Sequence, residues 1–223
     1  MSNENKHRYS QAERHAISRV IAERRDVRHF CGGHVEPETL WHILDAAHHA
    51  PSVGFMQPWR FIRITDQSLR LQLHALVDAE RLLTADSLNE RSTEFMRLKI
   101  EGILDCAELL VVALTDQREK YILGRRTMPE MDLASASCAI QNMWLTARAE
   151  GLGMGWVSFF APDKLGKLLN MPADSQAIAI LCLGPVEQFD HKPLLETQGW
   201  DKRKKLQNLV FENSWCENTD NSD

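Results

Sequence analysis

The sequence lacks the cysteine spacing of a metal site or of a disulfide framework. It holds no CxxC pair among its 223 residues, and its cysteines are scattered and odd in number. They are Cys31, Cys106, Cys138, Cys182 and Cys216. Zinc knuckles and disulfide-stapled folds are therefore not indicated, and a reducing cytoplasm is the expected location. The neighbouring His42, His48 and His49 have no cysteine partner at ligand spacing, so no metal is expected.

Long apolar runs and an excess of positive charge are also missing. No run approaches the roughly 20 apolar residues that span a bilayer, and the polar start MSNENKHRYS shows no signal peptide. Lys and Arg number 26 against 31 Asp and Glu, a formal net charge of −5. Because phosphate contacts need clustered basic surface, neither a nucleic-acid partner nor a membrane partner is expected.

What is present is the composition of a globular domain, with 43% hydrophobic residues. We expect a single domain over residues 1–216, followed by a polar, disordered tail over 217–223. Hydrophobic periodicity and turn signals predict helices over 11–23, 37–50, 66–104, 130–150 and 162–169. They predict strands over 24–30, 60–65, 109–115, 155–160 and 177–184. Mixed helices and short strands indicate helices that cover a central sheet.

The first motif with chemical character is RRDVR, residues 24–28. In an extended chain alternate side chains share a face, which places Arg24, Asp26 and Arg28 on one side. Guanidinium groups match phosphate oxygens, and neighbouring cations can compensate a carboxylate in such a site. From these residues alone, a phosphate site and a solvated cluster of ion pairs both stay open.

The second motif is the loop APSVGFMQPW, residues 50–59. Gly54 would let a ligand approach the backbone closely. Phe55, Met56 and Trp59 offer flat or polarisable surface to an aromatic ring. The alternative is a plain turn whose aromatic residues belong to the core.

The glycines of GLGMGWVS, residues 151–158, do not indicate a dinucleotide-binding fold. They follow a predicted helix and precede a predicted strand, which is the reverse of the order in that fold. Ser158 is a hydroxyl in an apolar strand and is either bonded to backbone or functional. The basic run 202–205 is either solvated surface or a further phosphate contact.

In this order the motifs resemble the FMN-dependent nitroreductase superfamily over nearly the whole chain. Asp26 in place of that superfamily's usual Ser, Phe55 in place of its usual Asn, LKIEGI (98–103) and GWVSFF (155–160) are similar to the BluB family of 5,6-dimethylbenzimidazole synthases. The resemblance implies an α+β fold with a central, mostly antiparallel sheet covered by helices. It also implies a homodimer in which a C-terminal extension embraces the partner.

The activity implied by the resemblance is that of an oxidoreductase that consumes its flavin. Reduced FMN would react with O2 and be fragmented to 5,6-dimethylbenzimidazole, the lower ligand of cobalamin, with erythrose 4-phosphate as the co-product. A separate NAD(P)H-dependent flavin reductase would supply the reduced FMN.

Site residues follow from the same resemblance, residue by residue. Asp26 and Ser158 match the catalytic residues, with Asp26 as the proton-transferring base and Ser158 as a hydrogen-bonding group. The residues that would bind FMN are Arg24, Arg25, Asp26, Val27, Arg28, Ser52, Met56, Ser158 and Arg203. Residues 78–102 are the candidate lid.

Two other classes of function remain open. A conventional NAD(P)H-dependent nitroreductase or flavin reductase would need an open face over the flavin for the nicotinamide. In a non-enzymatic flavin-binding protein, Asp26 and Ser158 would be structural only. The apolar residues near the C-terminus, from Leu206 to Trp215, are expected to be buried against some surface.

Overall fold

The computed structural model describes residues 6–215, and the chain divides into two compact units, residues 1–189 and 190–223. The first unit is built on a four-stranded sheet in the order β1-β2-β4-β3. Its strands are β1 (Trp59–Arg63), β2 (Glu108–Leu114), β3 (Gly153–Val157) and β4 (Gln176–Gly184). All three strand pairings in this sheet are antiparallel, which confirms the expected α+β class.

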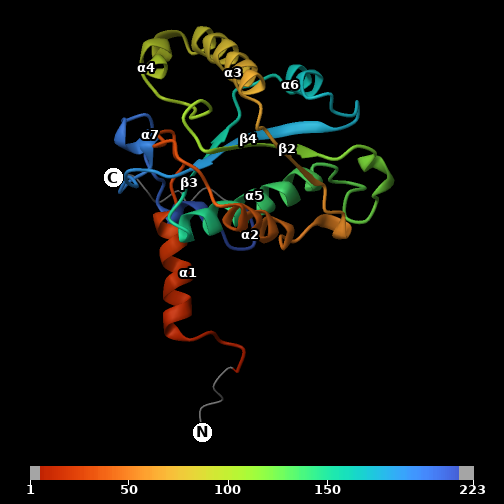
Figure 1. Cartoon of the computed structure of the whole chain (residues 1–223). Coiled ribbons are helices and arrows are strands. Elements are labelled where there is room, and N and C mark those ends of the chain that lie inside the picture. The colour runs from red at the N-terminus through yellow and green to blue at the C-terminus, as the bar shows by residue number, and fades with distance from the viewer. Residues whose placement is uncertain (1–5, 216–223) are drawn as a thin grey trace. The chain divides into compact units, whose positions relative to one another are not determined.

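Helices cover both faces of the sheet (Figure 1). One face carries α2 (Pro37–His48) and α5 (Met131–Ala149), and the other carries α3 (Gln67–Ser87) and α6 (Pro162–Leu168). The short α4 (Ser92–Met96) follows α3. The whole of β2 is buried, because it lies between two strands and under helices on both faces. The core is thus continuous from α2 and α5 into the sheet.

Helix α1 (Gln11–Glu23) begins and ends at the predicted residues. A reciprocal capping box fixes its start: the Ser10 N–H donates to the Glu13 carboxylate at 2.8 Å, and the Glu13 N–H donates to the Ser10 hydroxyl at 3.3 Å. Its apolar residues Ile17 and Ile21 remain exposed, and no residue of α1 is buried.

Two predicted elements differ from the structure. The helix predicted over 66–104 ends at Ser87 and resumes only as α4, since Asn89 adopts a left-handed backbone with φ +47°. The strand predicted over 24–30 is reduced to one parallel bridge between Asp26 and Met154. Side chains make hydrogen bonds where a strand ladder would be expected. The Asp26 carboxylate accepts the Trp156 N–H, and the Arg28 guanidinium donates to the Trp156 carbonyl.

The second unit contains α7 (Leu194–Thr197) and the 3-10 turn η4 (Leu206–Leu209). The rings of Phe211 and Trp215 stack with centroids 5.0 Å apart. Leu206, Leu209, Val210 and Trp215 are exposed. The predicted tail over 217–223 lies outside the described residues. Among residues 6–215, no helix combines the length and the hydropathy needed to cross a membrane.

Candidate functional site

The carboxylate of Asp26 is fixed by two donors. Arg28 pairs with it through both terminal nitrogens, Nη1 to Oδ1 and Nη2 to Oδ2, and the backbone N–H of Trp156 donates to Oδ1 at 3.0 Å. Arg28 also donates to the Trp156 carbonyl at 2.9 Å. Its side chain is 11% exposed, whereas that of Asp26 is 43% exposed. The arrangement therefore presents an oriented carboxylate to solvent beside a nearly buried guanidinium.

Glycines explain why this segment can lie directly on β3. A Cβ on Gly155 would lie 2.1 Å from the Val27 carbonyl oxygen, and one on Gly153 would lie 3.1 Å from a Val27 methyl. The Val27 N–H donates to the Met154 carbonyl at 3.0 Å. The space beside Gly153 and Gly155 is thus filled by residues of the chain itself, and the absence of a Cβ at these two positions allows residues 24–28 to pack on β3.

Trp144 of α5 holds the segment from the other side. Its indole N–H lies 3.0 Å from the Arg25 carbonyl and 2.9 Å from the Met154 carbonyl. The Arg24 guanidinium lies over the Trp144 ring, 4.6 Å from its centroid. Arg25 donates to the backbone carbonyls of Ala22 and Arg24, each at 2.8 Å.

Glu23 gives the same region a second carboxylate. Hydrogen bonding from Arg19 lowers the pKa of Glu23 below its usual range, and the charges of Arg148 and Arg25 add to this effect. The Arg148 guanidinium donates to Glu23 at 2.7 Å, which ties the end of α1 to α5. Residues 23–28 therefore combine three guanidinium groups with two carboxylates.

The strand predicted over 155–160 ends at Val157, so the prediction that Ser158 lies within an apolar strand is wrong. Ser158 is exposed and lies just beyond the last residue of β3. It follows two residues after Trp156, whose N–H holds Asp26, so one short segment supports both predicted catalytic residues. Its neighbour Phe159 packs against Phe95 of α4, with ring centroids 5.7 Å apart. The segment predicted as a lid is thus anchored beside Ser158 through the buried Phe95.

The loop between α2 and β1 includes the 3-10 turn η1 (Val53–Phe55). The Ser52 hydroxyl accepts the Gln57 N–H at 3.1 Å, and Met56 is buried. Both predicted contact residues therefore support the loop itself, whereas the Phe55 side chain is 84% exposed. The Val53 N–H donates to the hydroxyl of Ser135 on α5 at 3.0 Å.

Arg203 is exposed in the second unit. Within residues 6–215, no group of three or more His, Cys, Asp and Glu side chains could hold a metal ion. A surface hollow of about 410 Å³ between α2 and α5 is lined in part by His42, Asp45, His49 and Asn142. It is not lined by any residue of the 24–28 segment.

Comparisons with known proteins identify the family. Residues 21–185 match the nitroreductase family. A protein of Rhodospirillum rubrum named 5,6-dimethylbenzimidazole synthase is 36% identical over 193 residues, which cover 86% of this chain and 92% of the relative. A protein of Rhodobacter capsulatus with the same name is 36% identical over 87% of this chain and 95% of its own length. The chain belongs to the nitroreductase family, in the group of the 5,6-dimethylbenzimidazole synthases.

Solved structures show the same nitroreductase fold. A BluB-like flavoprotein from Clostridium difficile superposes with a TM-score of 0.68 at 18% identity, over 87% of this chain and 97% of the other. An iodotyrosine deiodinase bound to FMN and 3-iodo-L-tyrosine gives a TM-score of 0.69 at 21% identity, over 89% and 100%. These likenesses confirm the architecture expected from the motifs.

Proposed function

We propose that this protein is a 5,6-dimethylbenzimidazole synthase that consumes reduced FMN and O2. Two relatives that are 36% identical over the aligned residues carry that name. The observation that carries the proposal is the carboxylate of Asp26, fixed by the Trp156 N–H and by Arg28 yet open to solvent.

The side chains of the 24–28 segment and of the loop before β1 fit FMN as a ligand. FMN combines a phosphate dianion with a flat ring system, and guanidinium groups suit the first while aromatic side chains suit the second. Residues 24–28 carry three guanidinium groups against the one carboxylate of Asp26. The exposed ring of Phe55 provides flat apolar surface on the loop that precedes β1.

Each residue can then be given a role. When bound, reduced FMN supplies the electrons that O2 accepts and the ring carbons that become the product. Asp26 takes up and returns protons, an effect that contributes about 10²–10⁴-fold in enzymes. Arg28 positions Asp26, while Arg24 and Arg25 bind the phosphate. Ser158 donates a hydrogen bond that orients the reacting group, since no base adjoins it to make it a nucleophile.

The proposal extends to assembly and location. We assign a homodimer, because the segment over residues 206–215 carries exposed apolar side chains. Reduced FMN has to be supplied by a donor of electrons, so a separate NAD(P)H-dependent flavin reductase acts as partner. The homodimer and the reductase partner both fit a protein of the cytoplasm.

The deciding experiment supplies the protein with excess reduced FMN in air and measures 5,6-dimethylbenzimidazole by mass spectrometry. Product above a heat-inactivated control supports the proposal. Complete recovery of intact oxidised FMN contradicts it. Rapid bleaching of bound FMN by NADPH alone would instead favour the conventional nitroreductase, and stable FMN binding without turnover would favour a binding protein.

A further inference from the structure

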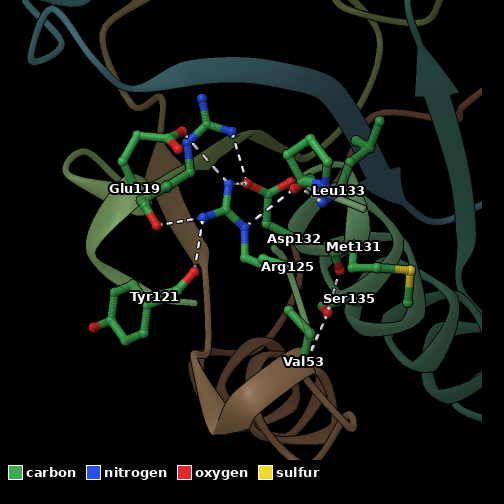
Figure 2. A network of polar contacts seen from close by, with 10 residues as sticks. Val53, Glu119, Tyr121, Arg125, Met131, Asp132, Leu133 and Ser135 are labelled. Carbon is green, nitrogen blue, oxygen red and sulfur yellow. Dashed lines mark hydrogen bonds and ion pairs between the residues drawn. The ribbon is translucent and has the colours of Figure 1, made fainter. Parts of the chain in front are cut away.

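A buried ion pair joins Arg125 to Asp132, outside the residues assigned above (Figure 2). Their side chains are 4% and 3% exposed. The Asp132 carboxylate accepts hydrogen bonds from Arg125 and from Arg118, each at 3.0 Å, and from the Leu133 N–H at 2.6 Å. Buried charges are costly unless they are fully hydrogen-bonded, so this pair needs a structural or functional explanation.

Arg125 organises the loop that precedes α5. Among the described residues 117–130 it is the only buried one, and the regular structure there is limited to the 3-10 turn η3 (Arg118–Lys120). Its guanidinium donates to the backbone carbonyls of Arg118, of Tyr121 at 3.2 Å and of Pro129 at 3.1 Å. One side chain thus closes the loop on itself, and Asp132 fastens that side chain to the first turn of α5.

The 117–130 loop packs closely against the loop that carries Phe55. A Cβ on Gly54 would lie 2.9 Å from the Leu123 carbonyl oxygen, and a Cβ on Gly124 would lie 2.6 Å from a Val53 methyl. Neither approach would be possible with a larger residue in place of these glycines. The two loops are therefore in close contact at Val53 and Gly54.

Helix α5 holds both loops through two residues of its first turns. The Ser135 hydroxyl accepts the Val53 N–H at 3.0 Å and donates to the Met131 carbonyl at 2.6 Å (Figure 2). Asp132 and Ser135 stand three residues apart, so they lie on neighbouring parts of one helix face. We call Asp132 and Ser135 the α5 anchor pair.

The backbone of residues 53–57 adopts unfavourable conformations. Phe55 has φ +55° and Gln57 has φ +49°, left-handed values that side chains with a Cβ rarely adopt. Such conformations persist only where the surrounding structure imposes them, and they cluster at ligand sites. The α5 anchor pair and the 117–130 loop provide that constraint at Val53 and Gly54.

We propose that Asp132 and Ser135 are positioning residues that hold the 117–130 loop against residues 53–57 and so fix the conformation in which that segment receives the ligand. The identity of the ligand as FMN rests on the proposed function. The coupling between the two loops does not, because it rests on contacts within the chain.

The test compares three variants of the full chain. Asp132→Asn removes the charge between the two arginines, and Ser135→Ala removes the acceptor of the Val53 N–H. The control is Glu108→Gln, because Glu108 is also buried and accepts two hydrogen bonds from Arg63, both at 2.7 Å. Arg63 is the last residue of β1, whereas residues 53–57 lie before the first residue of that strand, so the control pair is at the opposite end of β1. Amide hydrogen exchange by mass spectrometry and oxidised-FMN affinity by fluorescence quenching are measured for each.

We expect Asp132→Asn to accelerate exchange in both 117–130 and 53–57 and to weaken FMN binding roughly 10- to 100-fold. Ser135→Ala should accelerate exchange at residues 53–57 but not at residues 117–130, and it should also weaken FMN binding. Glu108→Gln should leave both the hydrogen exchange at residues 53–57 and the affinity for FMN unchanged.

The proposal is overturned if Asp132→Asn loosens residues 117–130 while exchange at 53–57 and FMN affinity stay at parental values. If Asp132→Asn does not fold, Ser135→Ala decides, and parental exchange and affinity in that variant overturn the proposal. A parental chain that binds no FMN would contradict the proposed function, while the exchange data would still decide the coupling.

Discussion

Asp26 and Arg28 share one ion pair but differ in what surrounds them. Arg28 is nearly enclosed and bonds the Trp156 carbonyl as well, so its position is set by the fold. Asp26 keeps one side open to solvent. A carboxylate placed in this way can exchange protons with a ligand while its partner stays still. Because removal of Asp26 would leave the nearly buried Arg28 guanidinium without its carboxylate, the pair is also sensitive to mutation.

At the residue scale, Asp26→Asn should abolish most product formation and retain FMN binding. The amide keeps the shape and can still accept the Trp156 N–H, but it cannot act as a base. We expect the rate of 5,6-dimethylbenzimidazole formation to fall by about 10²–10⁴-fold, measured by mass spectrometry beside an FMN titration. Asp45→Asn, an exposed carboxylate paired with His49, is the control. Product at the parental rate in Asp26→Asn would show that another group moves the protons.

The sequence identifies some of these residues and not others. Asp26 and Ser158 stand in recognisable motifs, so their segment could be predicted, although the pairing of Asp26 with Arg28 and Trp156 could not. Ser135 and Trp144 act on partners 82 and 119 residues away. Such contacts depend on how α5 packs, and a small polar residue or an indole on a helix gives no local signal of them.

At the element scale, the 24–28 segment behaves as an edge strand whose ladder is partly made by side chains. It can rest on β3 only because Gly155 has no Cβ to meet the Val27 carbonyl. The position of Asp26 therefore depends on Gly155, which stands 129 positions further along the chain.

Substitution of this glycine tests that dependence. Gly155→Ala should displace the 24–28 segment, lower the free energy of unfolding by about 1–3 kcal/mol through overpacking, and remove product formation. Gly166→Ala is the matched control, because its Cβ would meet nothing within 4 Å inside α6. It should stabilise the fold by about 0.4–1 kcal/mol. The free energy of unfolding of both variants is measured by denaturant unfolding. A Gly155→Ala variant as stable as the parent chain would show that the contact with Val27 is unimportant.

Helix α1 should loosen in acid. Hydrogen bonds from Ser10 lower the pKa of Glu13, and the hydrogen bond from Arg19, with the charges of Arg148 and Arg25, lowers that of Glu23. A carboxyl group with a lowered pKa in the folded state stabilises that state above its ordinary pKa, and this contribution is lost as pH falls through the lowered value.

The measurement is the pH dependence of the backbone amide chemical shifts of α1. We expect fraying below the ordinary range of glutamate, before the sheet unfolds. The variant with Glu13→Gln and Glu23→Gln should show the frayed spectrum already at neutral pH. A spectrum of α1 that stays unchanged until global unfolding would contradict this expectation.

Element boundaries were predictable where local chemistry sets them. The capping box at Ser10 defines α1, and Pro37 stands at the first position of α2. The break after Ser87 was not predictable, because an asparagine gives no sign of whether it will adopt a left-handed backbone. Alternating side chains predict a strand over residues 24–30, but in the structure the side chains of Asp26 and Arg28 make the hydrogen bonds that a ladder would make.

At the scale of the whole molecule, apolar surface near the C-terminus is the outstanding feature. Trp215 is 86% exposed and Leu206 is 73% exposed. Groups of exposed apolar side chains on soluble proteins mark sites of association. This favours assembly of two copies.

Light scattering should give a mass near twice the 25.5 kDa of one chain. The variant with Leu206→Ser and Trp215→Ser should shift toward the monomer and keep its far-UV circular dichroism spectrum. Lys164→Ser, on the exposed side of α6, serves as the control for surface substitution. A monomeric parent chain at micromolar concentration, or a variant that dimerises as the parent does, would contradict the assignment.

The Met154 carbonyl accepts two donors, the Val27 N–H at 3.0 Å and the Trp144 indole N–H at 2.9 Å. Both of its lone pairs are therefore occupied. A nitrogen-15 spectrum should resolve these two protons as separate resonances, one from the backbone and one from the indole. They offer a built-in probe: any compound that disturbs the segment around Asp26 should shift both signals together, which makes the pair suitable for ligand screening without a chromophore.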